Sequence, residues 1–130
     1  MVCLLLSITT LVCGCAFGIV KFELTKIFKM YAFESKYIEE NYQHPISIDE
    51  ISDVCHFSSS HFMKYFKKVM GTSFTDYLNE YRLSMASRLL LSSSDNILEI
   101  AAECGYDNLS YFNRLFKKKY GVTPSAYRNK

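Results

Sequence analysis

The sequence predicts an all-α fold in which two helix-turn-helix units are joined by one long linker helix. Apolar residues recur at helical spacing in almost every segment after residue 33, which indicates amphipathic helices. Pairs of residues that cap helix N-termini, such as Ser47 with Glu50, precede these segments. One pattern is also written twice, as SHFMKYFKKVMG at 60–71 and SYFNRLFKKKYG at 110–121. Two copies are too few for a solenoid, so we expect a duplicated module.

The composition is that of a chain able to bury a core, because 49% of its 130 residues are hydrophobic and 15% are aromatic. It excludes an intrinsically disordered chain. The net charge is only +2, but from His56 onward eleven Lys and Arg residues stand against six Asp and Glu. The part before His56 is therefore acidic. A basic half of this kind is typical of a domain that meets a polyanion.

Neither the cysteines nor the histidines indicate a metal site or a catalytic centre. The five cysteines include no Cys-x-x-Cys pair, and His44, His56 and His61 do not supply the missing ligands of a zinc site. Cys55 and Cys104 each end an apolar helical pattern, where a free Cys behaves as a small hydrophobe. We therefore expect both in the core, with no activated nucleophile, no enzyme activity and no cofactor.

The N-terminal run at residues 2–20, VCLLLSITTLVCGCAFGIV, carries no charge. As a helix it would reach about 28 Å, close to the thickness of a bilayer core. It is a candidate transmembrane helix, and the lysines that follow it would place the rest of the chain in the cytoplasm. It can equally be a buried helix of a larger upstream domain, of which this chain would be a fragment. With a short basic linker it forms a segment at 1–30, which precedes the helical region at 31–130.

The first predicted unit covers about 47–71. The helix before it ends near His44, because Pro45 disfavours a helical conformation in the residue that precedes it. Ser47 starts the next helix in a capping box. The buried face of that helix is expected at Ile48, Ile51 and Val54. After the turn HFSSS, the second helix has its inward face at Phe62, Tyr65, Phe66 and Val69, and Gly71 ends it.

A long linker helix is predicted at about 74–91, with Ser73 and Asp76 as its capping residues. Its apolar residues keep helical spacing at Tyr77, Leu78, Tyr81, Met85, Leu89 and Leu90. At about 1.5 Å per residue the helix spans on the order of 28 Å.

The second predicted unit, at about 96–121, repeats the first. Asn96 and Glu99 form its capping pair. Gly105 stands in the turn where a left-handed residue is expected, and His56 stands at the equivalent position of the first unit. The small residues Ser52 and Ala101 also match, and they would let the two helices of each unit approach closely.

The second helix of each unit carries polar side chains opposite its apolar stripe. On the helix at 108–120 the stripe is Leu109, Phe112, Leu115, Phe116 and Tyr120. The opposite face holds Ser110, Asn113, Arg114 and Lys117, and in the first unit Ser60, Met63, Lys64 and Lys67. Arg can form two hydrogen bonds with guanine, Asn can do so with adenine, Met suits a thymine methyl group, and Lys and Ser suit phosphates.

A lysine run alone usually marks a solvated surface. Here the polar face is repeated behind two matching helix-turn-helix units, which a solvated surface does not require. The linker helix would separate the two faces by about one 34 Å turn of DNA. We therefore interpret the two faces as recognition surfaces for successive major grooves of one duplex.

The segments YLNEYRLSMASRLL, from Tyr77, and ILEIAAECGYDNLSYFNRLFKKKYGVTPSAYR, from Ile97, resemble the DNA-binding domain of AraC/XylS-type transcriptional regulators. The resemblance runs from about Ile38 to Arg128. It implies two homeodomain-like helix-turn-helix units joined by a linker helix. It also implies sequence-specific binding to double-stranded DNA at promoters near RNA polymerase, usually with activation of transcription.

Carried across position by position, the resemblance assigns two sets of DNA contacts. Base contacts are implied for Ser60, Met63, Lys64, Ser110, Asn113 and Arg114. Phosphate contacts are implied for Ser59, His61, Lys67, Lys68, Asn108, Tyr111, Lys117 and Lys118.

The chain departs from that family in what precedes the resemblance. Most members carry a sensory domain there, whereas here only the apolar run and the basic linker stand before it, too little to build a pocket for a small-molecule effector. A minimal regulator, a membrane-tethered one and a fragment without its sensor remain open. The alternative function is a helical adaptor that docks proteins or membranes with the same surfaces, and it predicts no preference for any duplex sequence.

Overall fold

The computed structural model describes residues 35–130, and all of the regular structure in this part is helical. Residues 35–41 form a helix. It is followed by α3 (Ile48–Val54), α4 (Ser59–Met70), α5 (Phe74–Ser92), α6 (Ile97–Glu103), α7 (Leu109–Tyr120) and α8 (Pro124–Arg128). None of these described helices combines the length and the apolar character needed to cross a bilayer. The candidate transmembrane run at 2–20, like the whole segment at 1–30, lies outside the described residues.

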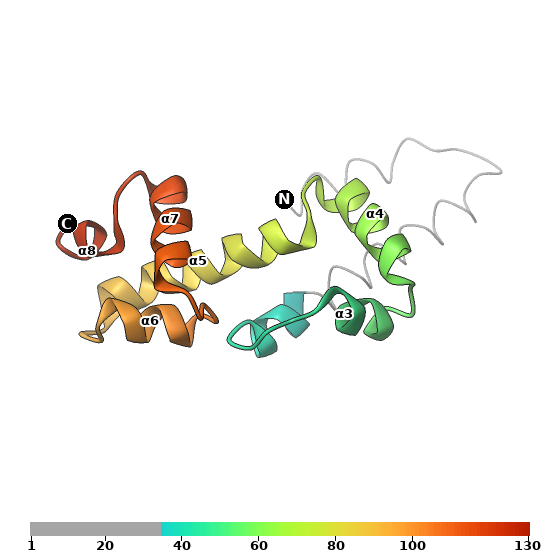
Figure 1. The fold of residues 1–130 in the computed structure, drawn as a ribbon, viewed down its shortest axis with the longest axis horizontal. Helices are drawn as coiled ribbons and strands as arrows, with labels where there is room; N and C mark the ends of the chain where they lie inside the picture. The colour runs from blue at the N-terminus through green and yellow to red at the C-terminus, as the bar shows by residue number, and fades with distance from the viewer. Residues whose placement is uncertain (1–34) are drawn as a thin grey trace, which may run out of the picture. The chain divides into compact units, whose positions relative to one another are not determined.

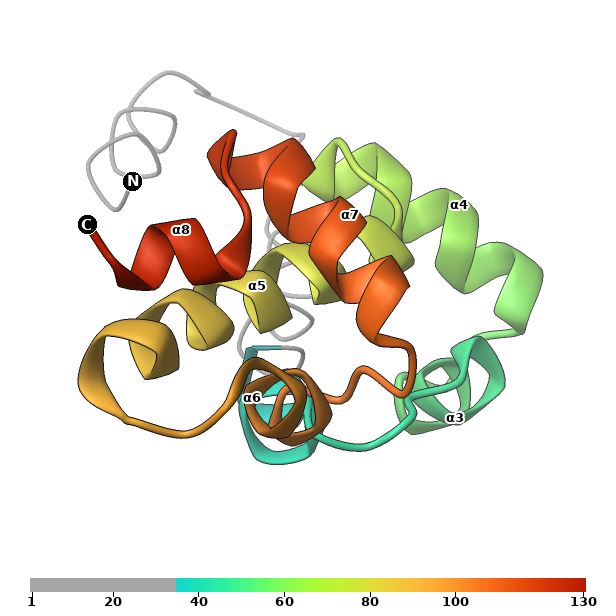
Figure 2. The same ribbon diagram turned by 60° about the vertical axis from the view of Figure 1, so that its left-hand side comes forward.

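The helix α5, 19 residues long, carries the two helix-turn-helix units, α3 with α4 and α6 with α7 (Figure 1). The views of Figures 1 and 2 agree that α4 and α7 lie on one side of α5, and α3 and α6 on the other. The all-α fold with two units and one long linker helix is therefore confirmed. This arrangement brings the second helices of both units to the same side of the molecule.

Each unit has its own hydrophobic core, and α5 contributes to both. The first core consists of Ile38, Ile51, Phe62, Phe66, Phe74 and Leu78. The second consists of Leu83, Ala86, Leu90, Ile100, Ala101, Cys104, Tyr106, Phe112 and Phe116. The α5 residues of the two cores lie on different sides of the helix, because their spacing departs from the helical repeat between Leu78 and Leu83. The single apolar stripe expected on this helix is therefore wrong in detail.

Short polar side chains cap every described helix from α3 to α8. The capping residues are Ser47, Ser58, Ser73, Asn96, Asn108 and Thr123. The reciprocal capping box is present at Asn96 and Glu99. At the equivalent point of the first unit, Ser47 accepts the Glu50 N–H at 3.0 Å, but the Glu50 carboxylate accepts the hydroxyl of Tyr37 at 2.7 Å. That carboxylate therefore ties the helix at 35–41 to α3.

The two turns between the helices of each unit match in backbone conformation. His56 has a φ of 57° and Gly105 has a φ of 81°, so both are left-handed as predicted. The matching small residues are also buried, with Ser52 1% exposed and Ala101 0% exposed. The Oγ of Ser52 lies 3.2 Å from that of Ser59, at the start of α4. The Ser52 contact confirms the close approach of α3 to α4, and in the second unit the small residue Ala101 is completely buried as expected.

One residue that was expected on the buried face of α3 lies outside the first core, because Val54 is 38% exposed. Cys55 is half-buried and packs against this core. The buried positions of α3 are Ile51 and Ser52, so the core side of this short helix is centred between them and Val54 falls well to one side. Cys104, by contrast, is fully buried as predicted.

Candidate nucleic-acid interface

The helix α7 presents the polar face that the sequence predicted. Phe112 and Phe116 are completely buried beneath it. Ser110, Arg114 and Lys117 are exposed on the other side, and Asn113 is half-buried there. The Oδ1 of Asn108 accepts the N–H of Tyr111 at 2.9 Å and so caps the helix. This cap occupies one acceptor of a side chain to which the resemblance assigns a phosphate contact.

A shallow pocket at the start of α7 is lined by Asn108, Ser110, Tyr111 and Arg114. The guanidinium carbon of Arg114 lies 5.2 Å from the centroid of the Tyr111 ring, within the range of a cation–π interaction. Asn79 of α5 donates from its Nδ2 to the Tyr111 hydroxyl at 3.5 Å. Four residues assigned to DNA contacts are therefore brought together in one place.

The three consecutive lysines at the end of α7 have different surroundings. Lys117 and Lys118 are exposed. The Nζ of Lys119 instead lies 2.5 Å from a carboxylate oxygen of Glu80, and donates to the Glu80 carbonyl at 3.0 Å and to the Ser84 hydroxyl at 3.2 Å. Lys119 therefore fastens α7 to α5, whereas Lys117 and Lys118 are available to a ligand.

The helix α4 presents the equivalent face of the first unit. Ser60, Met63, Lys64, Lys67 and Lys68 are all exposed. Met63 is 49% exposed, so its side chain is accessible on this face. The polar face of α4 is thus as accessible as that of α7.

Two residues at the start of α4, both assigned to phosphate contacts, have partners within the protein. The ring of His61 stacks on that of Tyr65, with centroids 5.9 Å apart. The hydroxyl of Ser59 donates to the carboxylate of Asp49 on α3. A carboxylate in contact with this hydroxyl disfavours a phosphate there by charge repulsion.

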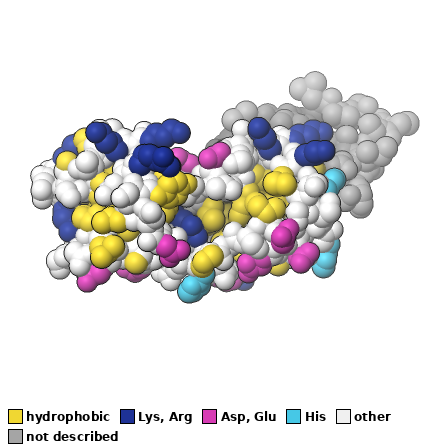
Figure 3. All heavy atoms as spheres, in the orientation of Figure 1, with side chains coloured by type: hydrophobic (Ala, Val, Ile, Leu, Met, Phe, Trp, Pro, Cys, Tyr) yellow, Lys and Arg dark blue, Asp and Glu magenta, His cyan; other side chains and the backbone are white. Residues whose placement is uncertain are grey.

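The charges of the described residues are separated in space. Figure 3 shows Lys and Arg side chains gathered over α7 and α4 along the upper edge of the molecule. Most Asp and Glu side chains in that view lie along the lower edge, over α3 and α6. An anion as long as a DNA duplex would therefore be attracted to the side on which α4 and α7 lie.

Two residues of α5 that the sequence analysis did not single out support this site. Asn79 accepts the hydroxyl of Tyr106 at its Oδ1, at 3.2 Å, in addition to its contact with Tyr111. Arg82 is only 9% exposed and donates to two main-chain carbonyls. Arg82 lies four residues after Leu78 and four before Ala86, so helical spacing places it on the apolar side of α5. Its charge alone suggests a solvent-facing position, because Arg is rarely fully buried.

Comparison with known proteins gives a consistent result. A family model described as a helix-turn-helix domain matches residues 51–130. The chain is 34% identical over 94 residues to the bifunctional transcriptional activator/DNA repair enzyme AdaA of Bacillus subtilis. The matched region covers 72% of this chain and 44% of AdaA. The chain spans less than half the length of the curated relatives it matches.

Two solved structures are similar in fold. The C-terminal domain of the two-component response regulator yesN from Fusobacterium nucleatum matches with a TM-score of 0.73 and 34% identity, over 77% of this chain and 98% of that one. A transcriptional regulator from Chromobacterium violaceum, described as one of the AraC-type DNA-binding domain-containing proteins, matches with a TM-score of 0.70 and 26% identity. This match covers 84% of the present chain and 94% of that one.

Proposed function

Because the chain belongs to the AraC-type family of helix-turn-helix transcriptional regulators, we propose that it binds double-stranded DNA sequence-specifically and regulates transcription. The recognition helices are α4 and α7, and they enter two successive major grooves on one side of a duplex. The observation that carries this proposal is the pair of exposed polar faces on the same side of α5. A solvated surface has no need of two such faces in the same orientation.

The domain organisation that we propose follows the helices. The region at 31–130 is the DNA-binding domain, with a first unit at about 47–71, a linker helix at about 74–91 and a second unit at about 96–121. The 19 residues of α5 correspond to about 28 Å at 1.5 Å per residue. This length is close to the 34 Å that separates major grooves on one side of a duplex.

The proposed base contacts are Ser110, Asn113 and Arg114 in the second unit, and Ser60, Met63 and Lys64 in the first. Arg114 suits guanine O6 and N7, and Asn113 suits adenine. The exposed Met63 suits a thymine methyl group. Lys67, Lys68, Lys117 and Lys118, which flank these residues on exposed helix faces, are proposed to bind phosphates.

Activation is the proposed sign of regulation, because the relative AdaA is named a transcriptional activator. An activator bound at a promoter lies near RNA polymerase, which is the proposed protein partner. The proposed location is on DNA in the cytoplasm, and a membrane tether through residues 2–20 remains part of the hypothesis. None of these proposals requires a small-molecule effector.

The test is selection of random duplexes by the full chain at near-physiological salt, followed by sequencing of the retained DNA. Two short motifs about 10 base pairs apart are expected, one for each recognition helix. Enrichment of only the motif read by α7, which carries Arg114, would reduce the first unit to a backbone contact. Retention without any enriched motif, abolished by a modest increase in salt, would contradict sequence-specific binding and favour the adaptor function.

A further inference from the structure

Near the middle of α5, between the two cores, Arg82 is tied to the segment that precedes α3. It is 9% exposed, and its Nε donates to the carbonyl of Tyr42 at 2.8 Å. Its Nη2 donates to the carbonyl of His44, also at 2.8 Å. These acceptors are main-chain atoms, whose positions follow the path of the backbone. Arg82 therefore holds the segment that precedes α3 against the midpoint of the linker helix.

The same guanidinium group packs against the second unit. Its central carbon lies 5.8 Å from the centroid of the Tyr106 ring. A Cβ atom added to Gly105 would lie 3.0 Å from that carbon and 2.6 Å from the carbonyl oxygen of Tyr42. The turn between α6 and α7 is thus in direct contact with Arg82 and with the segment that precedes α3. Three segments that are distant in the sequence meet at this side chain.

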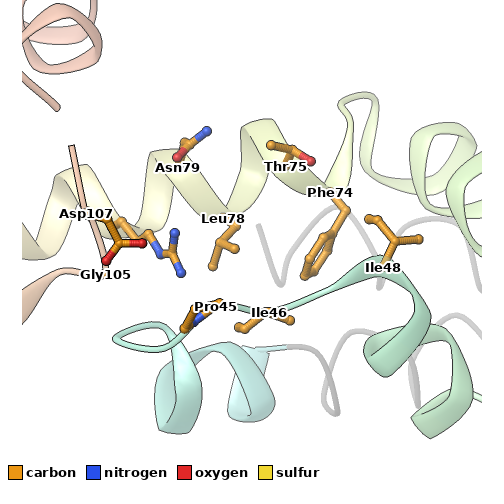
Figure 4. A pocket seen from close by; sticks show the side chains of 10 residues that line it. Pro45, Ile46, Ile48, Phe74, Thr75, Leu78, Asn79, Gly105 and Asp107 are labelled. Carbon is orange, nitrogen blue, oxygen red and sulfur yellow. The ribbon is translucent and has the colours of Figure 1, made fainter. Parts of the chain in front are cut away.

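A pocket of about 280 Å³ lies along the same junction. Figure 4 shows Pro45 and Ile46, from the segment that precedes α3, below α5, and Gly105 and Asp107 of the second unit beside it. Side chains do not fill this part of the junction. The contacts of Arg82 join the two sides of the junction at the point where α5 passes from one core to the other.

Long helices in proteins curve gently, and a bend in α5 would move its two ends relative to each other. Such a bend would change the separation and relative rotation of α4 and α7. On the basis of the proposed function, we infer that Arg82 is a positioning residue that sets the relative placement of the two recognition helices. It thereby restricts the protein to one spacing between the two halves of its DNA site.

The test compares duplexes that carry the two selected motifs at their natural spacing with duplexes that have one or two base pairs added or removed between them. The full chain, its Arg82→Met variant and its Arg82→Lys variant are measured on each duplex and on single half-sites. Met keeps the apolar stem of Arg without its donors. Arg88→Met is the matched control, because Arg88 is an exposed residue on the same helix.

The wild-type chain is expected to lose at least about tenfold in affinity when one base pair is added, because the second half-site then rotates away from α7. For Arg82→Met, the added base pair is expected to lower the affinity by less than about threefold. The affinity of this variant for single half-sites should be unchanged, since the recognition residues are untouched. Arg82→Lys is expected to be intermediate, because one ammonium group cannot reproduce the planar fork of donors. Arg88→Met is expected to match the wild type.

An unchanged spacing penalty in Arg82→Met would overturn the inference, and so would a wild-type chain that tolerates every spacing. If circular dichroism shows that Arg82→Met does not fold, Arg82→Lys provides the test. The quantity compared is the spacing ratio, which is the affinity at the natural spacing divided by the affinity with one base pair added. A ratio equal to that of the wild type overturns the inference and a lower ratio supports it. A wild-type chain that selects no DNA sequence would instead contradict the proposed function, and the role of Arg82 would fall with it.

Discussion

The guanidinium group of Arg114 lies over the ring of Tyr111, with 5.2 Å between the guanidinium carbon and the ring centroid. The Tyr111 hydroxyl accepts a hydrogen bond from Asn79 at 3.5 Å, and Asn79 in turn accepts one from Tyr106 at 3.2 Å. A path of contacts therefore leads from α5 to the proposed guanine-reading side chain. A side chain that is already ordered loses less conformational entropy when it binds.

Tyr111 is therefore expected to strengthen DNA binding by ordering the side chain of Arg114. This role can add to the phosphate contact assigned to Tyr111 or replace it. Tyr111→Ala should weaken binding to the selected site by about 0.5–1 kcal/mol, the usual value of an exposed cation–π pair. Tyr111→Phe keeps the ring and should bind nearly as well as the wild type. Fluorescence anisotropy with labelled duplexes measures both affinities. Equal losses in the two variants would show that the hydroxyl, through the DNA phosphate or through Asn79, matters rather than the ring.

Arg114→Ala should weaken binding by about 1–3 kcal/mol and relax the preference at a single base pair, because a bidentate contact to guanine is lost. The measurement is the affinity for the selected site and for the three substitutions at each base pair of the second motif. Arg128→Ala offers a comparison outside the recognition helices. A loss of the same size on every sequence would count against Arg114 as a base reader.

The lysines at 117–119 should differ in their contribution to the salt dependence of binding. Lys117→Ala, and equally Lys118→Ala, should flatten the slope of log affinity against log salt by about one, as expected for one lost phosphate contact. Lys119→Ala should leave the slope unchanged. It should cost at most about 1 kcal/mol of folding stability, because its ion pair with Glu80 is near the surface. A flattened slope for Lys119→Ala would contradict the role that we assign to it.

Three left-handed glycines provide a matched test of the junction around Arg82. A Cβ atom would meet nothing within 4 Å at Gly71 or Gly121, but at Gly105 it would lie 2.6 Å from the Tyr42 carbonyl oxygen. Gly71→Ala and Gly121→Ala should each cost about 1–2 kcal/mol, the strain of a left-handed alanine. Gly105→Ala should cost about 1–3 kcal/mol more, because of overpacking. Urea unfolding measures the free energy of unfolding of the three variants. Equal losses would mean that the residues around Gly105 move aside at little cost.

Cys104 should be unreactive as long as the protein is folded. Burial, assisted by the nearby charge of Glu103, raises the pKa of its thiol from 9.0 to about 12. The thiol is then neutral at pH 8, and labelling with a disulfide reagent should require unfolding. Because the folded-state pKa is the higher one, this group's stabilising contribution is complete below about pH 9 and is lost as the pH rises toward 12.

Peptide mass spectrometry distinguishes the cysteines in the labelling experiment. The half-buried Cys55 serves as the internal comparison and should be labelled faster than Cys104. Urea should make the two rates similar. Labelling of Cys104 at the rate of Cys55 in the native protein would contradict its place in the second core.

Much of the described fold and of the candidate site could be predicted from the sequence, because their signals are local. The capping residues, the left-handed turn at Gly105 and its counterpart His56, and the polar faces of α4 and α7 all follow from residue type and helical spacing. Because the sequence pattern occurs twice, each of these features could be predicted from two separate segments. The position of Val54 could not be predicted, because it depends on where the core lies relative to a helix of seven residues.

The sequence by itself determined that helices form, where they begin and end, and which sides of them are apolar, since hydrogen bonding and side-chain sterics within a few residues control these features. Only the tertiary structure decided which charged residues leave the solvent. Arg82 is buried at the junction of the two units, and Lys119, unlike its two neighbours, turns toward Glu80. The physical reason is that their partners are 35 to 40 positions away in the chain, so only the packing of one helix on another brings acceptors within reach of these charges.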